Sequence, residues 1–314
     1  MLEICELTRR YGAFTALDHL SLQIGEGELH GFVGPNGAGK TTTMRILATL
    51  LAPSEGTALI DGVDVVREPR RVRELVGYMP DFFGVYDHLK SWEYLDFYAR
   101  CYGFGASDRA RMVAQLLELV HLSDKRDVYV DSLSRGMKQR LCLAHALIHD
   151  PKLLILDEPA SGMDPRARAE MKGILRSLKD LGKTVLISSH ILPELSEMCD
   201  SLTIIDHGKL VFSGSVEALS QHMRGQAAIH LRLLPDAGEE AVRQAATLLK
   251  QYPGVTGIER GDEPGALRIA YQGDDAGAAD LLEALLRGGV RLCGFHRPPM
   301  NLEKVFMEVT RDDG

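Results

Sequence analysis

Short apolar runs alternate with helical patterns over about the first 220 residues of the chain. Strands that are buried on both faces of a parallel sheet have such runs. Four of them end at polar or turn residues: Leu29–Val33, Leu153–Leu156, Thr184–Ser188 and Leu202–Ile205. Helical spacing of apolar residues marks the stretches Thr41–Leu51, Ala106–Val120, Arg135–His149 and Pro165–Leu181. The alternation predicts an α/β fold built on a parallel sheet.

A different pattern begins after His222. Strand-like alternation and helical spacing follow in the order β-α-β-β-α-β, over residues 227–234, 239–252, 254–260, 266–272, 280–287 and 290–295. This order is typical of ferredoxin-like α+β domains. A short amphipathic helix is expected at Asn301–Thr310. We therefore predict a first domain over residues 1–222 and a smaller one over 223–314, with the boundary near Met223–Gln226.

The composition is that of a globular protein without a membrane span. Acidic residues outnumber basic ones by 44 to 36, and the formal net charge of −8 argues against non-specific binding to nucleic acid. No run reaches the roughly 18 apolar residues needed to cross a bilayer, and the first residues lack the apolar stretch of a signal peptide. The five cysteines have no metal-ligand spacing, which predicts free thiols in a reducing compartment.

The strongest chemical signal is GPNGAGKTT, which follows the apolar run Leu29–Val33 and opens a helix. It fits the phosphate-binding pattern G-x-x-x-x-G-K-[ST] in the context that the motif requires. Its glycines let backbone N–H groups turn toward phosphate oxygens. Lys40 supplies a positive charge there, and Thr41 offers a hydroxyl to Mg²⁺. The candidate phosphate-binding residues are Gly34, Pro35, Asn36, Gly37, Ala38, Gly39, Lys40, Thr41 and Thr42.

Two acidic residues follow the apolar run Leu153–Leu156. Asp157 is placed to hold Mg²⁺ at the carboxyl end of a strand, and Glu158 is placed to act as general base on an attacking water. Just upstream, LSRGMKQ puts Ser134 at the start of a helix. Two interpretations of Ser134 stay open: an ordinary N-cap, which the residues by themselves favour, and a second anion site.

Six features occur in the order and spacing of ATP-binding cassette (ABC) ATPases. They are Tyr11, GPNGAGKTT, LSRGMKQ, LLILDEP, SGMD and His190. Residues 2 to about 220 therefore resemble this family, which implies a P-loop NTPase cassette that binds ATP and Mg²⁺, with a helical subdomain over about 82–150.

The resemblance also implies roles for individual residues. Tyr11 would stack on adenine, and His190 would contact the γ-phosphate and orient the attacking water. Ser134 and Gly136 would grip the ATP held by a second cassette, in a head-to-tail dimer that we expect to be formed by identical chains. The loop residue Asp164 would couple the two sites.

Two positions depart from the family pattern. Asp81 stands where the family usually has a glutamine that contacts Mg²⁺ and the attacking water. Its side chain is shorter and charged, and we keep it as a candidate nucleotide and metal ligand. Arg135 stands where the family usually has glycine, while Ser134 and Gly136 remain. We therefore expect the phosphate clamp to be intact.

Ten of the 19 aromatic residues lie between Tyr78 and Phe104. Some of them are expected to form the core of the helical subdomain. Aromatic residues also mark the cores of interfaces, and in the ABC family this region receives a helix of the transmembrane subunit. We therefore expect a separate polytopic membrane subunit to dock here, which places the chain at the cytoplasmic face of the membrane. The expected contact residues are Phe82, Phe83, Val85 and Tyr86.

The C-terminal module, with its ending NLEKVFMEVT, resembles the accessory domain of drug, antibiotic and polysaccharide exporters. The sequence thus predicts the ATP-hydrolysing subunit of an ABC transporter that works as an exporter. The alternative is a soluble ABC ATPase that remodels nucleic acid or ribosomes, but such proteins carry two cassettes or a long coiled-coil insertion. A P-loop kinase or switch GTPase would leave LSRGM and His190 without a role.

Overall fold

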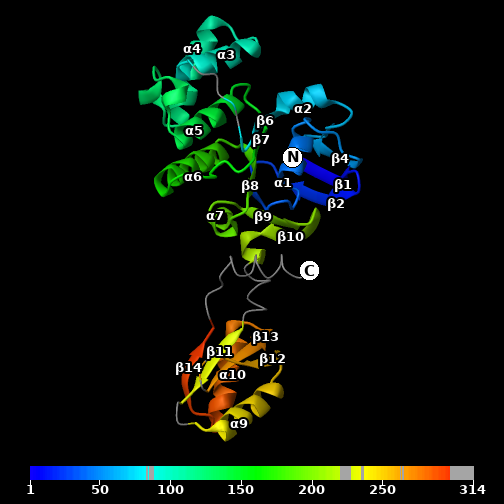
Figure 1. The fold of residues 1–314 in the computed structure, drawn as a ribbon, viewed down its shortest axis with the longest axis vertical. Helices are drawn as coiled ribbons and strands as arrows, with labels where there is room; N and C mark the ends of the chain where they lie inside the picture. Colours follow the sequence, from blue (N-terminus) through cyan, green and yellow to red (C-terminus); the bar gives the residue numbers. More distant parts are fainter. Residues whose placement is uncertain are drawn as a thin grey trace. The chain divides into compact units, whose positions relative to one another are not determined.

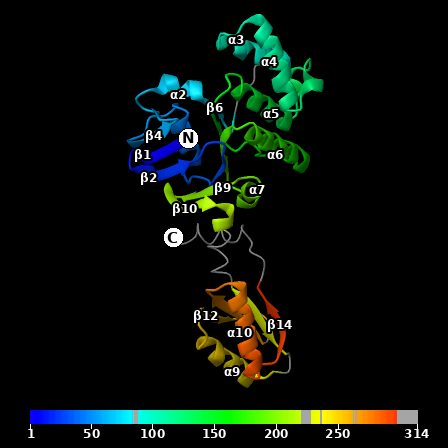
Figure 2. The same ribbon diagram turned by 180° about the vertical axis from the view of Figure 1, so that it is seen from behind.

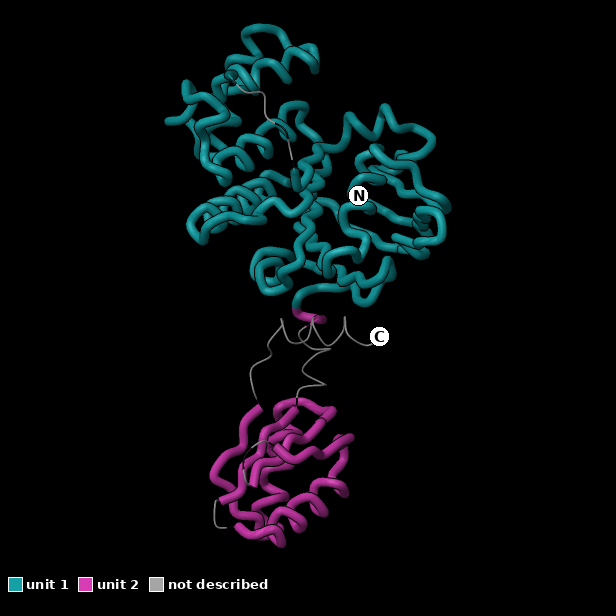
Figure 3. The backbone as a smooth tube through the Cα atoms, viewed as in Figure 1, with its two compact units in different colours: residues 1–216, 313–314 teal, residues 217–312 magenta. Residues whose placement is uncertain are grey.

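The computed structural model of the chain describes residues 1–82, 84, 88–219, 228–234, 237–261, 263 and 265–297. The chain divides into two compact units, residues 1–216 and 217–312 (Figure 3). Several predictions lie outside the described residues: the boundary near 223–226, the helix at 301–310, and the contact residues Phe83, Val85 and Tyr86. Within the described part, no helix has both the length and the apolar character that crossing a bilayer demands.

A six-stranded sheet runs through the first unit (Figure 1). Its order is β10-β9-β3-β8-β7-β6, and all neighbours are parallel except β10 and β9. The strands are β3 (Leu29–Val33), β6 (Val76–Met79), β7 (Leu153–Leu156), β8 (Thr184–Ser189), β9 (Ser201–Asp206) and β10 (Lys209–Ser215). The four predicted strands are confirmed to within one residue at each end. Because β3, β8 and β7 are parallel neighbours, the motifs that follow them meet at one edge.

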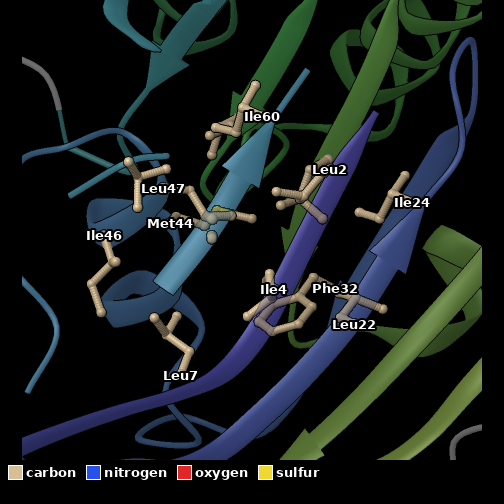
Figure 4. Packing of buried hydrophobic residues seen from close by; sticks show 14 of the residues in the cluster. Leu2, Ile4, Leu7, Leu22, Ile24, Phe32, Met44, Ile46, Leu47 and Ile60 are labelled. Atoms are coloured by element: carbon tan, nitrogen blue, oxygen red, sulfur yellow. The ribbon is translucent and has the colours of Figure 1, made fainter. Parts of the chain in front are cut away.

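A second, antiparallel sheet in this unit was not predicted from the sequence pattern. Its order is β2-β1-β4-β5. The strands are β1 (Leu2–Tyr11), β2 (Phe14–Ile24), β4 (Glu55–Ile60) and β5 (Val63–Asp64). Leu2 and Ile4 of this sheet share one buried cluster with Phe32 of β3 and Met44 of helix α1 (Lys40–Leu47), as Figure 4 shows. This core places the β1–β2 hairpin beside the start of α1.

Helices cover the other side of the first unit. Helices α5 (Arg135–Ala146) and α6 (Pro165–Asp180) pack on each other, with α5 against β6 and α6 against β8. Helices α3 (Ser91–Cys101) and α4 (Ala106–Leu119) pack on α5 and form a helical end of this unit (Figures 1 and 2). The described part also includes α2 (Pro69–Leu75), α7 (Leu192–Ser196) and the 3₁₀ turns Ser123–Lys125 and Val130–Ser132.

The predicted helices α4, α5 and α6 are confirmed, and each ends one to three residues before the predicted end. The prediction for α1 was wrong at its C-terminal end, since the helix stops at Leu47 rather than Leu51. Thr49 adopts a left-handed backbone with φ 59°, and this conformation does not continue a right-handed helix.

The second unit confirms the predicted order of elements. It contains β11 (Ile229–Leu233), α9 (Glu239–Lys250), β12 (Val255–Arg260), β13 (Ala266–Tyr271), α10 (Asp275–Arg287) and β14 (Leu292–His296). The strands form one antiparallel sheet, β12-β13-β11-β14. Their buried residues share a core with both helices. Helix α10 begins five residues before the predicted start at residue 280, because the Asp274 side chain caps it by accepting from the Gly277 N–H at 2.8 Å.

Candidate functional site

The phosphate-binding loop connects β3 to α1 and opens the helix with a glycine. Gly39 is the N-cap of α1 and has φ 106°, a conformation that residues with a Cβ atom rarely adopt. A Cβ atom at this position would lie 2.7 Å from the carbonyl oxygen of Ala16. Only glycine therefore fits between the loop and β2. The helix N-terminus and its free N–H groups provide an anion site.

The predicted loop residues divide into two groups. Asn36, Gly37, Gly39, Lys40, Thr41 and Thr42 line a hollow of about 450 Å³, a volume within the range of small-ligand pockets. The others hold the loop in place from outside the hollow. Ala38 N–H donates to the carbonyl of Pro35 at 3.2 Å, Gly208 N–H donates to that of Ala38 at 3.0 Å, and Gly34 N–H donates to that of Ser189 at 3.4 Å.

Lys40 is buried between the loop and the acidic residues. Its ammonium donates to the carbonyl oxygens of Gly34 at 2.7 Å and Pro35 at 3.2 Å, and it lies 3.7 Å from Glu158 Oε1. Burial lowers the pKa of Lys40, while the carboxylates of Glu158 and Asp157 oppose that shift. The Lys40 side chain thus lies next to both acidic residues, at the start of the helix that follows the phosphate loop.

The two acidic residues of LLILDEP share one hydroxyl. Asp157 is 1% exposed, and its Oδ1 accepts a hydrogen bond from Ser188 Oγ at 2.6 Å. The backbone N–H of Glu158 donates to the same Ser188 Oγ at 2.8 Å. Glu158 has a left-handed backbone, φ 51°, which is uncommon for a residue other than glycine and concentrates at functional sites. Sequence reasoning missed Ser188.

The donor set beside the hollow fits a magnesium ion. Asp157 Oδ2 is buried and has no hydrogen-bond partner among the described residues, which leaves a carboxylate oxygen available to a cation. The Thr41 hydroxyl and the exposed Asp81, just after β6, come from residues that line the hollow. No group of three or more Asp, Glu, His or Cys side chains gathers around a metal position in the described part of the chain. Mg²⁺ suits such a site because it takes one or two carboxylates plus phosphates and water.

His190 and Glu158 form a pair that also lines the hollow. His190 follows β8, and its Nδ1 lies 3.0 Å from Glu158 Oε2 and 3.1 Å from Oε1. An ionised carboxylate only accepts hydrogen bonds, so Nδ1 carries the proton in this pair. The imidazole ring thus reaches the hollow with its position set by Glu158, and both residues line the hollow with Lys40.

The β1–β2 hairpin supplies the aromatic side of the hollow. Tyr11 is 47% exposed and Phe14 62% exposed, and both line the hollow with Ala16. Tyr11 and Phe14 are cross-strand partners, since only two residues separate the strands. Sequence reasoning identified Tyr11 but missed Phe14 and Ala16. It included Ser161 only as the first residue of SGMD and gave it no site role, although Ser161 also lines the hollow. The short gap between two aromatic residues was the available signal for Phe14.

Ser134, Gly136 and Asp164 are not among the described residues that line this hollow. Ser134 is the N-cap of α5, and its Oγ accepts from the Met137 N–H at 3.3 Å. Gly136 allows α5 to approach α6, since a Cβ there would lie 2.9 Å from Ala167 Cβ. Asp164 caps α6 by accepting from the N–H groups of residues 166 and 167. The structure therefore confirms the capping role of Ser134 and does not bring it to the phosphate loop of its own chain.

Comparison with known proteins identifies the class of protein to which this site belongs. Residues 17–161 match the family model described as "ABC transporter". The Nod factor export ATP-binding protein I of Sinorhizobium fredii is 35% identical over 98% of this chain and 85% of its own length. The chain belongs to the ABC transporter family. It is the ATP-binding subunit that hydrolyses ATP.

Two further matches are a second curated relative and a solved structure. The daunorubicin/doxorubicin resistance ATP-binding protein DrrA of Streptomyces peucetius is 36% identical over 98% of this chain and 92% of its own length. Among solved structures, a dimeric post-hydrolysis state of the cassette MJ0796 with ADP and Pi has a TM-score of 0.63 and 23% identity. It covers 69% of this chain and 99% of its own. That likeness confirms the fold of the cassette.

Proposed function

We propose that this ABC subunit powers export through a separate membrane subunit, and that it works as a pair of identical cassettes. The direction of export is supported by relatives whose names refer to Nod factor export and to drug resistance, which match this chain over nearly its whole length. The match extends across the accessory unit, so both units of the chain have counterparts in these relatives.

The observation that carries the proposal is the hollow in which the Lys40 loop, Glu158, His190 and Tyr11 converge. Adenine stacks on Tyr11, while Lys40 and the loop N–H groups hold the β- and γ-phosphates. Glu158 takes a proton from water as the water oxygen attacks the γ-phosphorus, and the bond to the ADP oxygen breaks. His190 positions the same water and phosphate. Catalysis in this arrangement is mainly positioning and electrostatic stabilisation.

Asp157, Thr41 and Asp81 are the residues that would hold Mg²⁺. The ion, when bound, neutralises phosphate charge that develops as ADP leaves. The buried, unpartnered Oδ2 of Asp157 supports this assignment most directly. Asp81, exposed and two residues past the end of β6, would add a second carboxylate to this set.

A second copy of the chain completes each ATP site in this proposal. Ser134 is exposed at the N-terminus of α5, where its hydroxyl and the helix N–H groups can meet the γ-phosphate bound by the partner. Gly136, in the same turn, lets α5 pack closely on α6, and Asp164 at the start of α6 couples the two sites. A cassette of the same fold, MJ0796, has been described as a dimer.

The membrane subunit would dock on the segment that contains Phe82, Phe83, Val85 and Tyr86, at the cytoplasmic face of the membrane. Phe82 is 90% exposed, a large apolar area that a partner would cover. The alternative function, remodelling of nucleic acid or ribosomes, needs a basic contact surface, whereas this chain has a net charge of −8. Extraction with mild detergent distinguishes the two, since a polytopic membrane protein co-purifies in one case and ribosomes or DNA in the other.

The decisive experiment replaces the proposed base. We expect Glu158→Gln to bind ATP without hydrolysing it, because an amide cannot accept the proton, and to accumulate as a closed dimer. Size-exclusion chromatography with ATP should show the variant at twice the chain mass of 34.6 kDa. Glu118→Gln, an exposed position on α4, is the matched control and should hydrolyse ATP as the wild type does. A monomeric Glu158→Gln protein with normal hydrolysis would refute the assignment.

A further inference from the structure

Arg9 lies against the aromatic ring that faces the nucleotide hollow. Its guanidinium carbon is 4.7 Å from the centroid of the Tyr11 ring, which is within the distance of a cation–π contact. Arg9 Nη1 donates to the carbonyl oxygen of Ala52 at 2.9 Å. Arg9 Nε is buried and has no hydrogen-bond partner in the described part of the chain. The guanidinium of the half-buried Arg9 is therefore held in place against the ring.

The two faces of the Tyr11 ring have different neighbours. Tyr11 lines the hollow together with Phe14, whereas Arg9 does not belong to the described residues that line it. A guanidinium centred 4.7 Å from the ring centroid occupies one face of the ring. The other face is then the one that remains for a flat ligand in the hollow.

We infer that Arg9 is a positioning residue for the base of ATP, acting through Tyr11; this rests on the stacking of adenine on Tyr11 proposed above. Two physical effects support it. An exposed tyrosine loses rotamer freedom when a ligand binds, and the contact with Arg9 restrains the ring before binding. The cation also attracts π-electron density toward its own face, which reduces the repulsion between the other face and the electron-rich purine ring.

The anchor of Arg9 links the base site to the phosphate site. Ala52 lies five residues beyond Leu47, the last residue of α1, and α1 begins at Lys40 of the phosphate loop. Arg9 thus connects β1, which carries Tyr11, to the segment that follows the phosphate-binding helix. The adenine and the phosphates of one nucleotide must span the distance between the ring and the loop, and Arg9 is one of the contacts that hold the strand with the ring to the segment after α1.

The test measures binding of ADP and of inorganic tripolyphosphate by isothermal titration calorimetry, using the full chain. Arg9→Ala should raise the Kd for ADP about two- to fivefold, the range expected for a solvent-accessible cation–π contact. It should leave the Kd for tripolyphosphate unchanged, since that probe has no base. The kcat for ATP should stay within about twofold of wild type, while KM rises. Arg10→Ala removes a neighbouring arginine that pairs with Glu55, and this control should change neither Kd.

A double-mutant cycle separates action through the ring from a merely structural role. In a Tyr11→Ala background, Arg9→Ala should have no further effect on ADP binding, and Arg9→Lys in the wild-type background should bind ADP more tightly than Arg9→Ala. Equal effects of Arg9→Ala with and without Tyr11, or a parallel loss of tripolyphosphate binding, would overturn the inference alone. If Tyr11→Ala itself left ADP binding unchanged, the proposed adenine stacking would fall as well.

Discussion

Replacing Ser188 with alanine removes one hydroxyl that serves both acidic residues of the site. The side chain is fully buried at the end of β8. Its Oγ donates to Asp157 Oδ1 at 2.6 Å and accepts from the Glu158 N–H at 2.8 Å. Alanine fits the same space, so the variant tests the hydrogen bonds with little change in packing.

The expected loss of stability follows from what the substitution leaves behind. A hydrogen bond to a charged acceptor contributes about 1.5–3 kcal/mol, and a buried N–H without a partner costs about 1–3 kcal/mol. Asp157 is almost fully buried, and its Oδ2 already has no partner among the described residues. We expect the free energy of unfolding to fall by about 3 kcal/mol. ATP hydrolysis should fall at least about tenfold, because Glu158 loses the contact that holds its left-handed backbone.

Urea unfolding followed by tryptophan fluorescence measures this change in the relevant unit. The only tryptophan of the chain is Trp92, which lies in α3 of the first unit. The matched control is Ser177→Ala, since Ser177 is exposed and its hydroxyl donates to the Gly173 carbonyl of its own helix at 3.2 Å. The control should unfold within about 0.5 kcal/mol of wild type. A Ser188→Ala protein that also stays within that range would refute our account of the shared hydroxyl.

Two further predictions concern packing and pH. Gly77→Ala should destabilise the first unit by about 2 kcal/mol or more, since a Cβ would lie 2.2 Å from the Ala146 carbonyl oxygen. Gly173→Ala, on the open face of α6, should instead stabilise this unit by about 0.5–1 kcal/mol. Urea titrations measure both changes. His145 stacks on Tyr98, and burial lowers its pKa from 6.5 to about 4. Between these two pH values the unfolded chain binds more protons than the folded chain, so the free energy of unfolding should fall as pH drops from 6.5 to 4. The dependence of this free energy on pH should be weaker in His145→Phe.

Each of these predictions has an outcome that contradicts it. A Gly77→Ala protein as stable as Gly173→Ala would show that β6 can move away from α5 at little cost. Burial also lowers the pKa of His149, so His145→Phe should reduce the pH slope without abolishing it. An unchanged slope would mean that the imidazole of His145 does not stay neutral in the folded chain.

Several features of the site could be predicted from the sequence because each depends on local chemistry. The glycines of GPNGAGKTT are needed where the backbone turns into α1, as the φ of 106° at Gly39 illustrates. Asp157 and Glu158 follow an unbroken apolar run, which indicates a buried strand with a polar end. The order of elements in the second unit was likewise readable from periodicity, since strands repeat every two residues and helices every 3.6.

The tertiary structure decided which of these residues meet. Ser188 serves Asp157 and Glu158 because β7 and β8 are parallel neighbours, with Leu156 opposite Ile187, and no local pattern reports that register. Arg9 and Phe14 belong to an antiparallel sheet whose alternation was overlooked. The sequence by itself determined the chemistry available, namely a phosphate loop, two carboxylates and an aromatic ring. Distances between residues far apart in the chain depend on strand order and packing, so the hollow, the shared hydroxyl and the arginine behind Tyr11 appeared only in the folded protein.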